Sequence, residues 1–185
     1  VGTRHRVPSV GWALVEDDRP GRFDVEAAKA AGVPDGPLFG RLQRGEAVTL
    51  DDGRVVEPAG LVGEARSGRT LVFSGDTRPC DAILARAVDC DLLVHEATFL
   101  DEDLERAKDT HHSTAREVAE RAHEARVRLL ALTHVSMRAS PRLVEEEARA
   151  IHPDTVVPRD LDLVEVPYRE KGAPELVKNG GREAS

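Results

Sequence analysis

From residue 70 onward, short apolar segments alternate with amphipathic ones, and this alternation restricts the fold more than any other feature of the chain. We expect strands at Thr70–Ser74, Leu92–His95, Leu129–Leu132, Thr155–Val157 and Leu163–Val166. The helices expected between them are Pro79–Val88, Thr114–Ala125 and Pro141–Ile151. Thr114 and Glu117 have the spacing of a capping box, which favours a helix start there. Strands that alternate with helices predict an α/β sandwich.

Residues 19–69 break this pattern after a first expected strand at Val7–Val15. Glycine and proline recur throughout the segment, and only Val25–Ala31 has a helical run. Its charges balance, with 8 basic and 8 acidic side chains. This composition predicts a protruding arm inserted into a domain of residues 1–169. Residues 170–185 are polar and are predicted to form a disordered tail.

Composition excludes several classes of protein. The net charge of −8 argues against a generic nucleic-acid binder, which needs a basic surface. No apolar run reaches about 18 residues, so we expect no membrane span. Cys80 and Cys90 form no Cys-x-x-Cys pair, which argues against a thiolate zinc site or a disulfide scaffold. The chain starts on Val1 without a leader, so we expect a cytoplasmic setting and part of a longer protein.

Polar motifs follow three of the expected strands and supply the candidate chemistry. Asp76, Glu96 and His134 each lie where an apolar strand ends. Ligands of α/β proteins gather at the carboxyl ends of strands, where loops converge. His5 precedes the first strand, and His112 precedes the capped helix. Together these residues predict a metal or acid–base site at one edge of the sheet.

Each of these residues also has a structural interpretation. Asp76 follows a glycine and fits an ordinary turn. His134 fits a hydrogen-bonded core histidine, Glu96 a buried paired carboxylate or a cap, and His112 a helix cap. The residues alone therefore predict no more than a metal hydrolase.

The combination of motifs resembles a known family. The matching strings, in the family's order over about residues 1–167, are His5-x-Val7-Pro8-Ser9-x-Gly11-Trp12, Pro20-Gly21-Arg22-Phe23, Gly36-Pro37-Leu38-Phe39-Gly40-Arg41-Leu42-x-x-Gly45, Phe73-Ser74-Gly75-Asp76-Thr77-Arg78-Pro79, Val94-His95-Glu96-Ala97-Thr98-Phe99, His112-Ser113-Thr114-Ala115 and Leu132-Thr133-His134-x-Ser136-x-Arg138. They resemble the C-terminal part of tRNase Z (ribonuclease Z), of the metallo-β-lactamase superfamily. The resemblance implies the C-terminal part of an αββα sandwich with a protruding arm.

The resemblance also assigns roles. It implies two Zn²⁺ ions per complete active site, with His5 as a ligand of the first, His134 of the second, and Asp76 bridging both. It implies that His112 donates a proton to the leaving group and that Glu96 orients His112. Arg138 and Asp160 match supporting positions, although Asp160 lies in a Pro158-Arg159-Asp160-Leu161 string where the family has Ala first.

The inserted segment matches the family's arm, which grips precursor tRNA away from the active site. The positions implied to bind RNA are Gly36, Pro37, Gly40, Arg41 and Arg44. Arginine suits phosphate contacts because its guanidinium pairs with two oxygens at once. The alternative interpretation is that the glycines and proline only form turns.

We therefore expect a zinc-dependent endoribonuclease that removes the 3′ trailer from precursor tRNA as a cytoplasmic homodimer. The family's His-x-His-x-Asp-His motif has no counterpart here, and three of the seven expected zinc ligands are present. This predicts an incomplete copy that is inactive alone. The alternatives are another hydrolase of the superfamily, such as a phosphodiesterase or an arylsulfatase-like enzyme, or a non-catalytic RNA-binding or dimerisation module.

Overall fold

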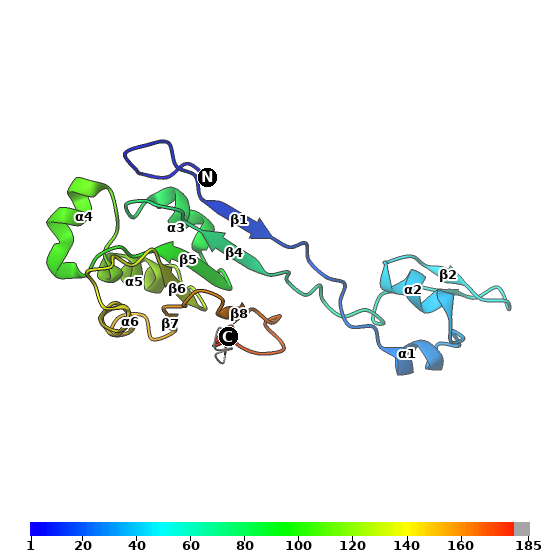
Figure 1. The fold of residues 1–185 in the computed structure, drawn as a ribbon. Helices are drawn as coiled ribbons and strands as arrows, with labels where there is room; N and C mark the ends of the chain where they lie inside the picture. The colour runs from blue at the N-terminus through cyan, green and yellow to red at the C-terminus, as the bar shows by residue number, and fades with distance from the viewer. Residues whose placement is uncertain (180–185) are drawn as a thin grey trace. The chain divides into compact units, whose positions relative to one another are not determined.

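The protein is represented by a computed structural model, which describes residues 1–179. The chain divides into two compact units. Unit 1 contains Val1–Val15 and the chain from Arg69 onward, and unit 2 is Glu16–Gly68. Each unit is described by itself below (Figure 1).

Unit 1 is built on a five-stranded sheet in the order β1-β4-β5-β6-β7. The strands are β1 (Trp12–Val15), β4 (Thr70–Phe73), β5 (Leu92–Glu96), β6 (Leu130–Thr133) and β7 (Thr155–Val156). β1 pairs antiparallel with β4, and the other neighbours are parallel. The carboxyl ends of β4, β5, β6 and β7 therefore lie along one edge. This mixed sheet with its helices confirms the predicted α/β class.

Alternating side chains divide the sheet into two apolar faces. One face packs Val72, Leu93 and Leu130 against helices, in the largest core of unit 1. The helices of the unit are α3 (Asp81–Ala87), η1 (Asp101–Asp103), α4 (Leu104–Thr110), α5 (Ala115–Glu124) and α6 (Pro141–Arg149). α3, α5 and α6 lie where the sequence predicts helices, and the Thr114–Glu117 capping box is present at the start of α5. η1 and α4 were not predicted.

The opposite face packs Leu92, Leu129 and Ala131 against a hairpin of β8 (Leu163–Glu165) and β9 (Glu175–Val177). β9 corrects the prediction of a disordered tail over 170–185. Leu176 packs on this second core, and the hairpin gains order from that apolar contact. Residues 180–185, the rest of the predicted tail, lie outside the described residues.

Part of the second face is open at the β1 edge. Trp12 lies opposite Phe73, and Leu14 lies opposite Leu71. Trp12 is 70% exposed, and Leu14 and Phe73 are also exposed. In the part of the chain that the structure describes, no helix is long and apolar enough to cross a membrane.

Unit 2 has a core of its own, which the sequence did not predict. It contains α1 (Val25–Ala30), α2 (Pro37–Gln43), β2 (Val48–Thr49) and β3 (Val55–Val56). Leu42, Val48 and Val33 are fully buried in it. The expectation that only Val25–Ala31 is helical was wrong for α2. Pro37 occupies the first turn of that helix, where a missing N–H costs nothing, and Gly36 caps it with a φ of +142°.

Candidate active site

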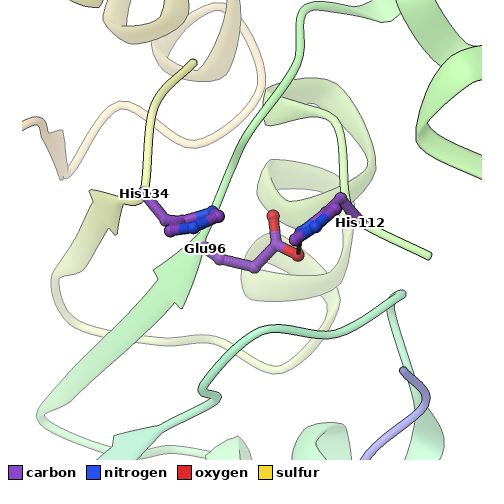
Figure 2. Close-up of side chains that lie close together, drawn as sticks. All are labelled: Glu96, His112 and His134. Atoms are coloured by element: carbon purple, nitrogen blue, oxygen red, sulfur yellow. Dashed lines mark hydrogen bonds and ion pairs between the residues drawn. The ribbon is translucent and has the colours of Figure 1, made fainter. Parts of the chain in front are cut away.

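The structure gathers a carboxylate and two imidazoles at the carboxyl edge of the sheet. Ligand atoms of Glu96, His112 and His134 all lie within 4.8 Å of one another. Glu96 is the last residue of β5, His134 follows β6, and His112 lies between α4 and α5. Figure 2 shows the Glu96 carboxylate directed at the His112 ring, with the His134 ring on its other side. The structure thus brings three of the five residues that the sequence analysis assigned to one site into a compact cluster.

Glu96 is the buried centre of this cluster and is 2% exposed. Its Oε1 accepts hydrogen bonds from Thr77 N (3.0 Å) and His112 Nδ1 (2.7 Å). Its Oε2 accepts from Thr98 N (3.1 Å), Thr98 Oγ1 (2.9 Å) and Ser113 N (3.2 Å). A carboxylate offers about four lone-pair sites, so these donors saturate it. Glu96 is therefore built to hold other groups in place and has no free lone pair for a metal.

The Thr98 hydroxyl links the two histidines to Glu96. Its oxygen lies 2.8 Å from His134 Nδ1 and 3.3 Å from His112 Nδ1. A hydroxyl has one proton, and when Thr98 gives it to Glu96 its oxygen accepts from His134 Nδ1–H. This tautomer leaves His134 Nε2 with its lone pair free. Thr98 belongs to the His95-Glu96-Ala97-Thr98 string, but sequence reasoning gave it no role.

His112 has one ring nitrogen occupied and one available. Its Nδ1–H donates to Glu96, which fixes the tautomer and leaves Nε2 as the second reactive atom. The ring stacks on that of His134, with centroids 5.2 Å apart. The His5 ring meets it edge-on at 4.9 Å. Three imidazoles are thus packed side by side at one edge of unit 1.

Asp76 and His5, which the resemblance assigned to metal, each contact one member of the cluster. Asp76 Oδ2 lies 3.8 Å from His134 Nε2, and both side chains are about half exposed. His5 Nδ1 lies 3.0 Å from the backbone carbonyl of His111, so it carries a proton and leaves Nε2 free. Two imidazoles with free Nε2 atoms and one carboxylate suit zinc. The donor chemistry therefore fits the implied metal, while the compact cluster contains His112 and Glu96 in addition to His134.

The two supporting residues do not join the cluster. Arg138 and Asp160 both lie in exposed turns. Near Asp160, it is Asp162 that fixes the chain, accepting hydrogen bonds from Arg159 N (2.9 Å) and Asn179 N (3.1 Å). These hydrogen bonds hold the pKa of Asp162 below its usual value.

Two other reactive residues are held in inactive forms. Burial lowers the pKa of His95, whose Nδ1 lies 2.7 Å from the carbonyl of Glu96. Burial also raises the pKa of the Cys90 thiol to about 12. His95 is therefore neutral at ordinary pH, and Cys90 is neither a nucleophile nor a metal ligand there.

The residues implied to bind RNA lie together on α2 of unit 2. Gly36 is the N-cap residue of the helix, Pro37 is its first residue, Gly40 and Arg41 lie within it, and Arg44 is its C-cap residue. Arg41 Nε and Arg44 Nε donate to opposite oxygens of Glu46, at 3.0 and 3.1 Å. These hydrogen bonds lower the pKa of Glu46. Glu46 was not singled out in the sequence, although it stands two residues from Arg44.

Comparisons with known proteins place the chain in a family. A family model described as a beta-lactamase superfamily domain matches residues 38–135, more than half of the chain. A ribonuclease Z of Gemmatimonas aurantiaca is 53% identical over 88% of this chain and 52% of its own length. A ribonuclease Z of Haloferax volcanii is 55% identical over 91% of this chain and 54% of its own length. The chain thus spans about half the length of the curated relatives it matches.

A solved structure of human tRNase Z, short form, is 28% identical to the chain. The match covers 61% of this chain and 36% of that one, with a TM-score of 0.44. The family model and the curated relatives carry the assignment. The resemblance predicted from the sequence motifs is confirmed: the chain belongs to the beta-lactamase superfamily and is a relative of the ribonucleases Z.

Proposed function

We propose that this chain is the part of a ribonuclease Z that carries the proton donor and one side of the metal site. The reaction is removal of the 3′ trailer from precursor tRNA, leaving a 3′-hydroxyl on the tRNA and a 5′-phosphate on the trailer. The observation that carries the proposal is the contact of His112 with both Glu96 and His134 at the carboxyl edge of the sheet. The roughly 50% identity to ribonucleases Z supports the substrate.

His5, Asp76 and His134 would hold the zinc ions from this side. When bound, two zinc ions would supply a lowered pKa for the attacking water and a positive charge next to the phosphate. Asp76 offers two carboxylate oxygens, which suits a bridging role between cations. His134 is orientated for this by Thr98, and His5 by the carbonyl of His111.

His112 would act as the general acid. Its Nδ1–H is held by Glu96, so a proton on Nε2 can be given to the leaving 3′-oxygen. The same protonated ring would stabilise negative charge that develops on that oxygen. Glu96 keeps the ring orientated and stabilises its positive charge, because its own donors hold it in place.

Unit 2 would bind the body of the tRNA. Arg41 and Arg44 each use Nε for Glu46, and their guanidinium Nη groups are the atoms we assign to phosphate. The complete enzyme is proposed to act in the cytoplasm as a homodimer, a state that sedimentation of the complete protein would test.

We also propose that the chain does not act alone. It supplies three zinc ligands, and a closed or catalytic zinc site needs more per metal. We expect the isolated 185-residue chain to bind zinc weakly and to self-associate through the open apolar face around Trp12.

A trailer-release assay, run beside a zinc count, tests the function. The chain alone should leave precursor tRNA intact, and supplying the remaining part of a ribonuclease Z, fused or in trans, should restore cleavage in proportion to bound zinc. Asp76→Ala should abolish the restored activity. Cleavage by the chain alone that survives Asp76→Ala would contradict the proposed two-zinc site.

A further inference from the structure

The loop that carries His112 has a second contact besides the hydrogen bond from its ring to Glu96. Arg78 Nη1 donates to the backbone carbonyl of His112 at 2.7 Å. The same nitrogen lies 2.8 Å from Glu117 Oε2, and Arg78 Nη2 pairs with Glu117 Oε1. The two side chains are only 16% and 22% exposed. One guanidinium therefore contacts both the His112 backbone, 34 residues along the chain from Arg78, and the Glu117 carboxylate, 39 residues along.

Both partners of this pair are themselves fixed. Glu117 is the third residue of α5, and its Oε2 accepts from Thr114 N at 3.1 Å in the capping box. Arg78 follows β4, and its backbone N–H donates to Arg4 O at 2.8 Å. The guanidinium thus links the segment after β4 to the start of α5. The carbonyl of His112 accepts a hydrogen bond from this same guanidinium.

The backbone at this place needs such a support. His111 ends α4 in the left-handed region, with a φ of +62°, and the chain turns sharply there. Non-glycine residues are disfavoured in this region, so neighbouring contacts must maintain the conformation. The hydrogen bond to Glu96 fixes one ring atom of His112, while the bond from Arg78 fixes its backbone. One contact to the ring and one to the backbone together determine where Nε2 lies.

We infer that Arg78 and Glu117 are positioning residues for His112, acting as a bidentate pair that sets the loop carrying the proton donor. The inference rests on the proposed function, because a proton donor at His112 is what requires the ring to be held in position. The rival account is an ordinary ion pair that stabilises the fold and has no specific effect on the His112 ring. Both accounts predict a loss of stability when the pair is broken, so the readout must be the ring itself.

The first experiment follows the His112 Nδ1–H signal by nitrogen-edited NMR of the 185-residue chain. In Arg78→Gln we expect this proton to exchange with water at least about 10-fold faster, because the ring leaves Glu96 more often. The matched control is Arg128→Gln, which breaks another part-buried pair, between Arg128 Nη1 and Asp91 Oδ1 at 2.9 Å. In the control, thermal stability should fall while His112 exchange stays unchanged. An unchanged His112 signal in Arg78→Gln, or equal acceleration in both variants, would overturn the inference.

Two further variants keep the test decisive if Arg78→Gln unfolds. Glu117→Gln preserves the capping box, since glutamine also serves at that position, but removes the charge that orientates Arg78. Arg78→Lys keeps the charge but cannot bond His112 and both oxygens of Glu117 together. We expect the His112 exchange rate to rise in the order wild type, Arg78→Lys, Glu117→Gln. A rate that does not differ among the three would refute the positioning role.

The second experiment uses the complete, reconstituted enzyme. Arg78→Gln should lower kcat about 10- to 100-fold with KM unchanged, since misplacing a catalytic group affects the transition state and not ground-state binding. Arg128→Gln should leave both values within about twofold of wild type. If the wild-type complex cleaves no precursor tRNA, the proposed function fails, and the NMR result still decides the positioning role separately.

Discussion

Two carboxylates in different units each pair with two arginines, but one carboxylate is buried and the other is exposed to solvent. In unit 1, Asp91 is 1% exposed, accepts hydrogen bonds from Arg128 Nη1 (2.9 Å) and Thr70 N (2.9 Å), and forms an ion pair with Arg169 Nε (3.1 Å). In unit 2, the side chain of Glu46 is 45% exposed and accepts from Arg41 and Arg44. A carboxylate paired with two arginines is thus a fixed, buried contact at Asp91 and a solvated surface cluster at Glu46.

This difference extends to the whole of each unit. In unit 1 the Glu96 carboxylate that holds His112 is buried and accepts five hydrogen bonds, so its geometry is fixed. The polar groups implied to bind RNA in unit 2 are exposed, and water screens their mutual attraction. We interpret unit 1 as the part that needs accurate positions and unit 2 as the part that needs accessible charge.

The largest effect is expected at His112, the proposed proton donor of unit 1. His112→Ala in the complete enzyme should reduce turnover by about 10²–10⁴, the usual contribution of a general acid, with zinc content unchanged. The measurement is single-turnover cleavage of precursor tRNA alongside metal analysis. His123→Ala, in the exposed part of α5, is the control and should be close to wild type. Loss of zinc from His112→Ala would make His112 a ligand and contradict its assigned role.

The next effect compares the two arginine-bound carboxylates directly. Asp91→Asn should lower the free energy of unfolding by about 3 kcal/mol, because two arginines lose a buried charged partner. Glu46→Gln should leave the unfolding midpoint unchanged, since exposed pairs contribute little. Urea titration of each variant measures both. Equal destabilisation by the two changes would remove the distinction drawn between the units.

Removing most of unit 2 should separate binding from chemistry. The backbones of Gly21 and Gly63 are already in contact, because a Cβ added to Gly21 would lie 1.9 Å from Gly63 O. Deleting about residues 22–62 in the complete enzyme should weaken precursor-tRNA binding by at least about 10-fold, or 1.4 kcal/mol. Hydrolysis of a small phosphodiester should be unaffected. Equal loss of both activities would place unit 2 in the catalytic machinery.

A finer test of unit 2 replaces two side chains. The double variant Arg41→Gln/Arg44→Gln should reduce the slope of log affinity against log salt concentration by about 2, because each arginine is expected to neutralise one phosphate. Fluorescence anisotropy at several salt concentrations gives the slope. Lys29→Gln removes an exposed cation that pairs with Asp35 in the same unit and serves as the control. A slope that does not change would mean that these arginines do not bind phosphate.

The smallest expected effect is the pH dependence of stability that arises from His152, a buried histidine of unit 1. Burial lowers the pKa of His152, while Asp154 raises it and His123 lowers it further. The unfolded chain therefore binds this proton more readily, so stability should fall as pH drops below the unfolded value of about 6.5. One proton accounts for at most about 1.4 kcal/mol per pH unit. His152→Gln should make the melting temperature depend less on pH between pH 7 and 5. The contribution of buried His95 to this pH dependence should remain.

Parts of the fold with periodic burial were predictable from the sequence. β4, β5 and β6 are short apolar runs, and α5 buries Val118 and Ala122 on one side. α4 was missed because only Ala107 of its residues is buried, so it has no apolar stripe. α2 was missed because its glycines and proline resemble turn signals. There, the packing of Leu42 outweighed local propensity.

The site was predictable in part for a related reason. Asp76 and His134 follow parallel strands and Glu96 ends one, and parallel strands bring their carboxyl ends to one edge. The Thr98 hydroxyl, which meets both histidines, depends on side-chain directions that no spacing reveals. The pairing of Arg78 with Glu117 joins the loop after β4 to the first turn of α5, which only the folded sheet brings together.

The pairing of β1 with β4 has a consequence for how such proteins diversify. Val15 lies opposite Thr70, so the whole of unit 2 is topologically the loop of one β-hairpin. The entropy of closing a loop rises only with the logarithm of its length, by about 0.6 kcal/mol for each doubling. Lengthening, shortening or exchanging this loop therefore disturbs the sheet little, especially when the inserted residues fold around their own core. Insertion and exchange at this hairpin can replace one compact unit by another, while the residues at the other strand ends keep their places.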